Sequence, residues 1–557
     1  MLNITNVFHN LILDYKENIP IFKPENDFGY IEYKLRLDKF DDKKIKKMMS
    51  QLKFRLNEGY DILGKHVAYY LIGVEDKGLV GYIDEEILNI SINILKEVVK
   101  NSHAEISNIK KIKYNNSHIA LLQIRKYSEN IYIKEFRTVF LGASNHGKTT
   151  CISQLTYNMK DNGNGSSRLC IFKHTHEQLS GLTSSIKHDI IGIKMNENII
   201  INYKSQFYST WNKIVQNSDY VISLFDLPGS SKYNKTTIFG LLALKPHLNI
   251  IVIGIPECLT LDTIPEETIK AFEYSINSKT NFFVIFTKKD NNLFNQDKII
   301  NAISKVNNYL KNHNIQLIEY NIYNEFKKDK KYYIIVSNIS GENYDKITNL
   351  LTDISSLELN HFKNYTEENT DNEDLDIDFL INDFFYIRET GYIVSGIQLL
   401  NKIRLGDKLY LGPYNGTFYP ITINSIRKKQ IEVKTLYEAE SGSLEIKLDH
   451  DINIDKHMNI LSQSIIKKID LVSTINIEIL NDKNINLIKN HNYILFTDNL
   501  IEPIILRDYE YNDKNKIIAK FDFIKKSGLY IRDSCFCIIK GENYNDVFIY
   551  GLRKLII

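Results

Sequence analysis

The chain has 557 residues, a formal net charge of +2 and five cysteines. This length predicts three or four domains. The balanced charge gives no sign that the chain as a whole binds nucleic acid electrostatically, so any contact with RNA must come from local basic patches. The scattered cysteines are typical of a protein from a reducing compartment. The sequence contains no run of about 18 consecutive apolar residues, the length that would predict a membrane helix. We therefore expect a soluble, cytoplasmic, monomeric protein without membrane contact.

The N-terminal quarter of the chain predicts a small α+β domain behind a short lead-in. Residues 1–35 show no sustained apolar period, and we expect them to be a partly ordered lead-in. Residues 36–136 alternate helix and strand patterns. In this domain Gly59 should stop the first helix and Asp84 should cap the second. We find no catalytic group of residues in this domain.

Residues 137–358 alternate strand and helix patterns, as in a doubly wound parallel sheet whose functional loops follow the carboxyl ends of the strands. The first strand ends in Gly-x-x-x-x-Gly-Lys-Thr, a motif whose glycines let backbone N–H groups surround phosphate. Lys148 can reach the β- and γ-phosphates, and Thr149 can offer a hydroxyl to Mg²⁺. The predicted phosphate-binding residues are Gly142, Ala143, Ser144, Asn145, His146, Gly147, Lys148, Thr149 and Thr150.

Two further strand ends predict a magnesium site and a base site. One buried-strand pattern ends in Asp226, which can hold the water shell of Mg²⁺, and Gly229 then lets the backbone approach the γ-phosphate. The next ends in Thr287, Lys288 and, two residues on, Asp290, whose carboxylate can accept both the N1–H and the N2–H₂ of guanine. Adenine would leave this carboxylate unpaired. A P-loop alone also fits ATP, so an ATP-using protein is the alternative for the nucleotide.

A fourth strand pattern leads into Ser337, Asn338 and Ile339, which are placed to close over the edge of the base. Thr183, between the P-loop and Asp226, lies in a Gly-Leu-Thr-Ser-Ser segment. A threonine there can bind Mg²⁺ only while the γ-phosphate is present, as in loops that sense the nucleotide state. The predicted metal-site residues are Thr149, Thr183 and, through water, Asp226.

The remainder of the chain predicts an acidic linker and two antiparallel β-barrels. Residues 359–376 carry many carboxylates without an apolar period. Short strand patterns spaced by turns then predict one barrel over residues 377–468 and another over residues 469–557. Three short basic clusters could contact RNA phosphates, although each alone is also typical of a solvated surface: Lys327–Lys331, Arg427–Lys429 and Lys525–Lys526.

A P-loop domain followed by two barrels resembles the translational GTPases, of which elongation factor Tu is the best-known member. Within them the chain resembles the branch of GTP-binding protein 1 and its relatives, through Ile72–Leu79, Gly181–Gly192, Lys232–Thr237 and Gly391–Gly396. The resemblance implies a GTPase that binds GTP or GDP, Mg²⁺, aminoacyl-tRNA and the ribosome. It also implies that hydrolysis changes the angle between domains, in elongation or ribosome rescue.

The chain departs from the family pattern at catalytic positions. Ser230 stands where the family usually has a histidine that helps to place the attacking water. Asn145 replaces an aspartate linked to a monovalent cation, and Ser144 replaces an apolar residue. Losing one well-placed catalytic group costs about 10²–10³ in rate. The alternative is therefore a GTP-dependent tRNA- or ribosome-binding module with little or no hydrolysis. The catalytic positions that the resemblance implies are Lys148, Thr183, Gly229 and Ser230.

Overall fold

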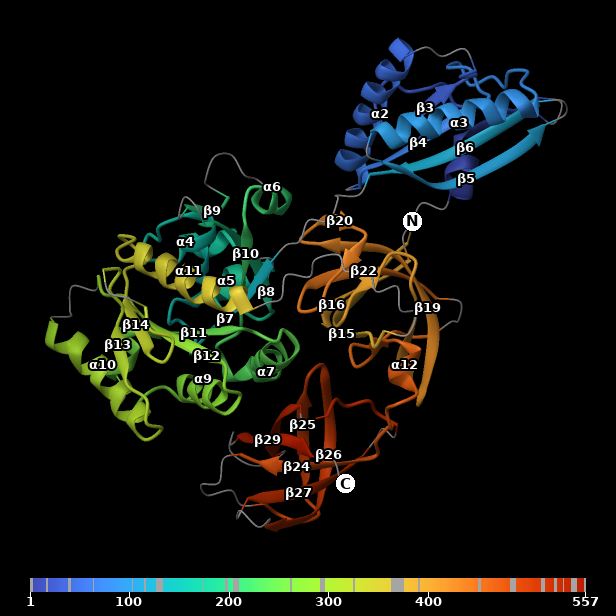
Figure 1. Cartoon of the computed structure of the whole chain (residues 1–557). Coiled ribbons are helices and arrows are strands. Elements are labelled where there is room, and N and C mark those ends of the chain that lie inside the picture. Colours follow the sequence, from blue (N-terminus) through green and yellow to red (C-terminus); the bar gives the residue numbers. More distant parts are fainter. Residues whose placement is uncertain are drawn as a thin grey trace.

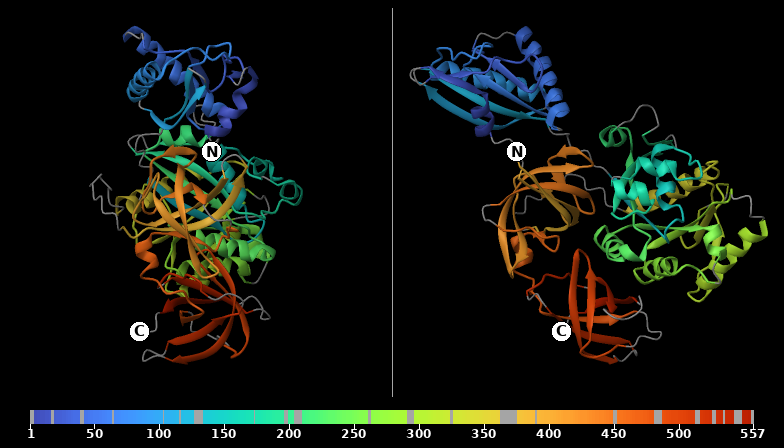
Figure 2. Two further views of the ribbon diagram at one scale, coloured as in Figure 1. Left: turned by 90° about the vertical axis from the view of Figure 1, so that its right-hand side faces the viewer. Right: turned by 180° about the vertical axis from the view of Figure 1, so that it is seen from behind.

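The computed structural model shows an N-terminal α+β part, a central α/β part and two C-terminal β-barrels (Figure 1), and so confirms the predicted fold class. The N-terminal part, the first barrel and the second barrel follow one another along the molecule, with the central part beside the barrels (Figure 2). The structure describes residues 4–554 except 17–18, 39–41, 64, 103, 115–116, 127–133, 173, 196–198, 204–209, 261–262, 291–295, 324–325, 362–374, 389–390, 449–451, 481–486, 512–515, 525–527, 534 and 542–547.

The N-terminal part is a four-stranded sheet covered by helices. Asp84 caps the second long helix as expected, since its carboxylate accepts a hydrogen bond from the Ile87 N–H at 2.8 Å. Gly59 is not a stop but lies inside the first long helix. A Cβ at Gly59 would come within 2.0 Å of the Val67 carbonyl oxygen, so this glycine lets the helix approach the neighbouring strand. The elements are β3 (Ile31–Lys34), α2 (Asp42–Leu63), β4 (Val67–Ile72), α3 (Glu85–Asn101), β5 (Glu105–Tyr114) and β6 (Ser117–Arg125).

The expected lead-in is folded over its described residues. It contains α1 (Ile4–Leu11), β1 (Ile12–Lys16) and β2 (Ile19–Phe22). Phe8 of α1 and Phe22 of β2 are both buried, and their rings meet edge to face with centroids 5.4 Å apart. The helix therefore covers the face of the N-terminal sheet that α2 and α3 leave open.

The central part is an eight-stranded sheet with helices on both faces. Six neighbouring strands are parallel, but β8 runs antiparallel to β10 and to the edge strand β9, so the sheet is mixed rather than fully parallel as expected. In spatial order the strands are β13 (Leu317–Glu319), β14 (Lys331–Ile335), β12 (Asn281–Thr287), β11 (Leu248–Gly254), β7 (Lys134–Leu141), β10 (Tyr220–Asp226), β8 (Lys187–Lys194) and β9 (Ile199–Ile201). The helices are α4 (Lys148–Tyr157), α5 (Thr175–Ser180), α6 (Trp211–Gln216), α7 (Asn234–Ala243), α8 (Ile255–Thr260), α9 (Glu266–Asn277), α10 (Gln296–Lys311) and α11 (Tyr344–His361).

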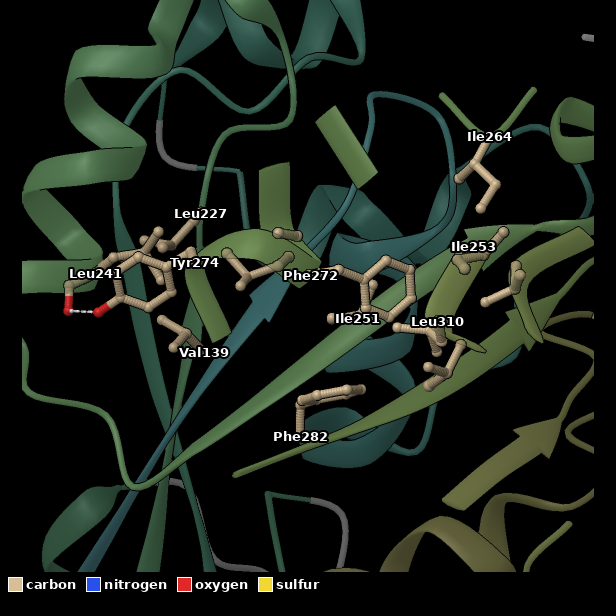
Figure 3. Packing of buried hydrophobic residues seen from close by; sticks show 14 of the residues in the cluster. Val139, Leu227, Leu241, Ile251, Ile253, Ile264, Phe272, Tyr274, Phe282 and Leu310 are labelled. Atoms are coloured by element: carbon tan, nitrogen blue, oxygen red, sulfur yellow. Dashed lines mark hydrogen bonds between the residues drawn. The ribbon is translucent and has the colours of Figure 1, made fainter. Parts of the chain in front are cut away.

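One face of this sheet packs against α7, α9 and α10. Figure 3 shows Phe272 of α9 between the strand residues Ile251 and Ile253 and Leu310 of α10. In the same cluster the buried hydroxyl of Tyr274 donates a hydrogen bond to the Leu241 carbonyl at 2.9 Å, which satisfies its only polar group. The opposite face packs against α4 and α11. Burial on both faces holds the loops at the carboxyl edge of the sheet in fixed positions.

Each C-terminal barrel closes with six antiparallel strands, and both contact the central part. Phe496, Ile538 and Tyr550 of the second barrel belong to the same apolar cluster as α7 and α9. The core of the first barrel is continuous with apolar residues of α6, β8 and β10. The first barrel contains β15 (Asp378–Ile387), β16 (Gly391–Leu400), β18 (Lys408–Tyr414), β19 (Thr417–Lys428), β22 (Ser441–Leu448) and β23 (Asn459–Leu461). The second contains β24 (Thr474–Ile479), β25 (Asn492–Thr497), β26 (Leu500–Tyr511), β27 (Ile517–Phe523), β28 (Phe536–Gly541) and β29 (Phe548–Lys554).

Short elements complete the barrel regions, namely β17 (Ile403–Arg404), β20 (Ile431–Val433), β21 (Thr435–Leu436) and α12 (Gln463–Ile466). Most of the expected acidic linker falls on residues 362–374, outside the described residues. None of the helices in the described ranges is both long enough and apolar enough to cross a bilayer.

Candidate nucleotide site

The loop between β7 and α4 has the backbone shape that a phosphate cradle needs. Gly142 has a φ of +126° and Gly147 a φ of +95°, a region that favours glycine. A Cβ at Gly142 would lie 2.3 Å from the Val252 carbonyl oxygen of the adjacent strand β11, so only glycine fits there. The loop then runs into α4, whose first residue is Lys148, so the free N–H groups of the helix start face the same space.

Lys148 is buried against this loop. Its ammonium group donates to the carbonyl oxygens of Gly142 and Ala143, both at 2.9 Å. Burial lowers the pKa of Lys148 to about 8, and the charge of Asp226 opposes that shift. Gly229 approaches from the next loop, where a Cβ would lie 2.3 Å from the Lys148 Nζ atom. The absence of a side chain at Gly229 thus lets this loop lie against the Lys148 ammonium.

Thr149, Thr183 and Asp226 converge at the carboxyl end of β10. The hydroxyl of Thr149 donates to Asp226 Oδ2 at 2.6 Å, and the hydroxyl of Thr183 lies 3.1 Å from the same oxygen and 2.9 Å from the Thr149 hydroxyl. The second oxygen of Asp226 is buried without a hydrogen-bond partner. Burial raises the pKa of Asp226, because a buried carboxylate lacks the stabilisation that water provides.

This group of oxygens fits a magnesium ion. Mg²⁺ takes oxygen ligands and usually keeps several waters, so two hydroxyls, a carboxylate and substrate phosphates suffice. The unpartnered Asp226 oxygen is an acceptor that a water bound to the metal can satisfy. The described residues hold no group of three or more His, Cys, Asp or Glu side chains that could bind a metal by themselves.

The loops after β12 and β14 form the far end of the same space. A cavity of about 610 Å³ is lined both by P-loop residues and by Lys288, Asp290, Asn338 and Ile339. The hydroxyl of Thr287 donates to the His146 carbonyl at 2.7 Å and so joins the β12 loop to the P-loop. Asp290 thus lies on the wall of the same cavity that the P-loop residues line.

The sequence-predicted residues divide into cavity wall and support. The wall contains Ser144, Asn145, Gly147, Lys148, Thr149, Thr150, Thr183, Gly229, Lys288, Asp290, Asn338 and Ile339. The cavity wall does not include Gly142, Ala143, His146, Asp226, Thr287, Ser230 and Ser337. Several of these support the wall from behind. The hydroxyl of Ser337 accepts hydrogen bonds from the N–H groups of Ile339 at 3.2 Å and Ser340 at 3.0 Å. His146 is buried, and this burial lowers its pKa to about 4.

Sequence reasoning missed a second wall of the cavity, which comes from the segment after α4. Asp161, Gly163, Gly165 and Arg168 all line the cavity. The carboxylate of Asp161 accepts N–H bonds from Gly163 at 3.0 Å, Gly165 at 3.0 Å and Ser167 at 3.1 Å, which folds the loop into a compact turn. The signal available in the sequence was the run Asp-Asn-Gly-Asn-Gly, which is typical of such a turn.

A buried ion pair behind Thr183 was also missed. Glu177 of α5 accepts hydrogen bonds from the Ser184 N–H at 2.8 Å and the Ser184 hydroxyl at 2.9 Å, and pairs with Lys187 at 2.5 Å. Burial alone would raise the pKa of Glu177, but the hydrogen bonds from Lys187 and Ser184 lower it to about 2. The residues that follow Thr183 are therefore fixed to α5.

The comparisons with known proteins agree with this geometry. Residues 134–358 match the family described as the elongation factor Tu GTP binding domain. The chain is 27% identical over 444 residues to mouse (Mus musculus) GTP-binding protein 2, which covers 77% of this chain and 70% of the relative. Over residues 134–358 the chain is therefore similar to the GTP-binding domain of elongation factor Tu, and over most of its length it is similar to GTP-binding protein 2.

Solved structures of translational GTPases share the fold. The GTPase-like domain of S. cerevisiae Ski7, bound to GTP, matches with a TM-score of 0.57 and 14% identity, over 76% of this chain and 98% of that one. The bacterial selenocysteine-specific elongation factor EF-Sec matches with a TM-score of 0.54 and 15% identity, over 76% of this chain. The present chain covers 59% of the length of that elongation factor. These likenesses show that the chain shares the fold of these proteins.

The predicted basic clusters do not all lie on the surface of the protein. Lys428 and Lys429 are both buried. Lys428 pairs with Glu440 of the same barrel at 2.6 Å, and Lys429 pairs with Glu135 of the central sheet at 2.6 Å. The suggestion that this cluster contacts RNA is therefore wrong for these two lysines. Lys328 pairs with Glu358 at 3.0 Å on the surface. Lys525 and Lys526 lie outside the described residues.

Proposed function

We propose that this protein is a GTPase of the translation-factor type that binds GTP with Mg²⁺ in the cavity described above. The observation that carries the proposal is the position of Asp290 on the same cavity wall as Lys148 and Thr149. A carboxylate at one end and a phosphate loop at the other select a guanine nucleotide by its base and its charge. The residues of the P-loop surround the phosphates, and Lys288, Asn338 and Ile339 enclose the base.

Thr149, Thr183 and Asp226 would hold the metal. When bound, Mg²⁺ neutralises charge on the phosphate oxygens and so favours transfer of the γ-phosphoryl group to water. Lys148 places a second positive charge at the phosphates, and Gly229 brings a backbone N–H close to them. Ser230 follows Gly229 and has a side chain too short to orient the attacking water as a histidine ring does. Hydrolysis by the isolated protein should therefore be slow.

A contact path from the nucleotide to the barrels supports a link between GTP state and domain arrangement. The loop of Gly229 and Ser230 leads directly into α7, which packs against β25 of the second barrel and β15 of the first. The Thr237 hydroxyl of α7 donates to the Pro228 carbonyl at 2.7 Å, so the helix is tied to this loop. Movement of the loop on loss of the γ-phosphate would be passed to both barrels.

The partners that we propose are aminoacyl-tRNA and the ribosome, in elongation or ribosome rescue. The support is the combination of a GTP-binding domain with two barrels and the elongation-factor name of the bacterial structure with this fold. We further propose a cytoplasmic monomer. The cysteines in the described part of the chain are all free thiols, which fits a reducing compartment.

The second candidate function is a GTP-loaded binding module that holds tRNA or ribosomes with little or no turnover. Ser230 in place of the usual histidine favours this alternative, as does the fixed position of Thr183 against Asp226. A protein whose switch threonine is already in place needs less rearrangement when GTP binds. The yeast Ski7 domain that shares this fold is described as GTPase-like and binds GTP, and as the alternative we propose the same character for this chain.

Single-turnover GTP hydrolysis separates the two functions. Purified protein is loaded with γ-labelled GTP, and phosphate release is followed with and without ribosomes. A GTPase predicts stimulation by ribosomes and a faster rate for Ser230→His, with the neighbouring Ser231→His as the matched control. If ribosomes do not stimulate the wild type and Ser230→His leaves the rate unchanged, the GTPase proposal is wrong and the binding module stands.

A further inference from the structure

Arg168 supplies a positive charge to the nucleotide cavity from outside the recognised motifs. It lies in a short 3₁₀ turn over Ser166–Cys170 and lines the cavity together with Lys148, Thr183 and Gly229. Arginine stays charged at all pH values at which proteins are folded, unlike the buried lysine, whose pKa falls to about 8. The cavity therefore has a permanently charged side chain that is not part of the P-loop.

The guanidinium of Arg168 is held in a narrow slot. Its NH1 group donates to the Gly181 carbonyl at 2.9 Å, two residues before the switch threonine Thr183. A Cβ at Gly165 would lie 2.0 Å from the NH2 group, and one at Gly181 would lie 3.2 Å from NH1. The ring centroid of Phe172 lies 5.9 Å from the guanidinium carbon. Glycine at both flanks thus makes room for the arginine beside the switch loop.

This cation has donors that the protein itself leaves unused. Within the ranges that the structure describes, no carboxylate forms an ion pair with Arg168, and its Nε atom is buried without a hydrogen-bond partner. Asp161, the acidic side chain of the same loop, directs its oxygens to the N–H groups of Gly163, Gly165 and Ser167 instead. A guanidinium carries five N–H donors, and a buried donor without an acceptor is costly. An anionic ligand in the cavity would satisfy them.

We propose that Arg168 binds the γ-phosphate of GTP and ties it to the switch loop through the Gly181 carbonyl. The inference rests on the proposed guanine nucleotide function of the cavity and assigns to it a residue that distinguishes GTP from GDP. Arginine forms strong, charge-assisted hydrogen bonds to phosphate oxygens. Because the same guanidinium contacts the loop that carries Thr183, binding of the third phosphate and closure of that loop favour each other.

The test compares the affinities of GppNHp, a triphosphate that is not hydrolysed, and GDP for matched variants. Arg168→Ala should weaken GppNHp binding by about 10-fold to 100-fold and change GDP binding by less than about 3-fold. Arg168→Gln still offers an N–H to the Gly181 carbonyl but has no charge, so it should lose the triphosphate preference as well. Arg507→Ala is the matched control, because it removes an arginine from an exposed ion pair of the second barrel and should leave the affinities for both nucleotides unchanged.

The outcomes separate this inference from the proposed function. If the wild type binds neither nucleotide, the proposed function itself fails. If the wild type binds both but Arg168→Ala keeps the same ratio of GppNHp to GDP affinity, only the role of Arg168 is overturned. An equal loss for both nucleotides, or full rescue by Arg168→Gln, would show that the arginine merely holds the loop. Circular dichroism of each variant establishes that it is folded before binding is measured.

Discussion

Lys429 in the first barrel lies 2.6 Å from Glu135 at the amino end of the P-loop strand β7, and both side chains are buried. The same ammonium donates to the hydroxyls of Ser223 at 2.9 Å and Ser441 at 3.0 Å, so all three of its N–H groups are used. Burial would raise the pKa of Glu135, but the charges of Lys429 and Arg137 hold it well below its usual range. The barrel is thus fixed to the sheet at the edge opposite the nucleotide.

Replacement of Lys429 by methionine should loosen this junction. The change leaves the Glu135 carboxylate buried without its partner, which costs about 3–5 kcal/mol. Trp211, the only tryptophan of the chain, has its ring centroid 6.0 Å from the Lys429 ammonium, so its fluorescence reports on the junction during urea unfolding. Lys434→Met breaks the exposed pair with Glu105 and should cost less than about 1 kcal/mol. Equal urea midpoints for the two variants would contradict the prediction.

The affinity for GTP should fall as the pH rises above about 8. Phosphates bind the protonated form of Lys148, whose pKa without nucleotide is about 8. Below pH 8 the Lys148 amine is already charged. Above pH 8 it must take up a proton when the nucleotide binds, so the Kd should rise by a factor that approaches about tenfold per pH unit. Titration calorimetry at pH values above 8, in buffers of different ionisation enthalpy, should show this proton uptake.

Lys148→Arg provides the control for that pH profile. Its guanidinium stays protonated, so the affinity of the variant should be lower overall but independent of pH over the same range. A wild-type Kd that does not change above pH 8 would show that the nucleotide does not contact the Lys148 ammonium.

The motif loops could be predicted from the sequence because their geometry follows from local rules. Each motif comes directly after a buried-strand pattern, and the carboxyl ends of neighbouring parallel strands meet at one edge of the sheet. This places the P-loop and Asp290 on one cavity although about 140 residues separate them. Asp84 was recognised as a helix cap for the same reason, since capping depends on the residues next to it.

Contacts between residues that are far apart in the chain could not be predicted from the sequence. Lys429 and Glu135 are 294 positions apart, so a basic cluster that pairs inside an interface has the same sequence signature as one on the surface. Gly59 was misread because a glycine that ends a helix and one that lets a strand come close differ only in their tertiary neighbours. Arg168 lies in a segment without apolar period, and only the packed structure brings it to the cavity.

Asp290→Asn should remove the preference for guanine. The carboxylate can accept hydrogen bonds from both N1–H and N2–H₂, whereas an amide offers one oxygen acceptor and a competing donor. For the wild type, ITP, which lacks the 2-amino group, should bind about 10-fold to 100-fold more weakly than GTP. In the variant this difference should nearly vanish, and competition by ATP and XTP should increase. Unchanged selectivity in the variant would refute the assignment of the base.

Glu177→Gln should release the switch loop. The change removes the Glu177 charge from the buried Lys187 ammonium, although the amide oxygen can still accept the hydrogen bonds from Ser184. Hydrogen exchange should therefore rise in residues 181–187 of the variant while exchange in the first barrel stays the same. GTP affinity should fall about tenfold, because Thr183 must then be ordered on binding.

The pH dependence of the same pair has a definite sign. The pKa of Glu177 is about 2 in the folded chain and lies near its ordinary 4.5 in the unfolded one. A carboxyl with a lowered pKa stabilises the fold above its unfolded pKa, and this stability is lost as the pH falls from about 4.5 towards 2. Protection of residues 181–187 should therefore decrease over that range in the wild type and change less in Glu177→Gln. Protection in the wild type that does not respond to pH there would show that the ion pair does not hold the loop.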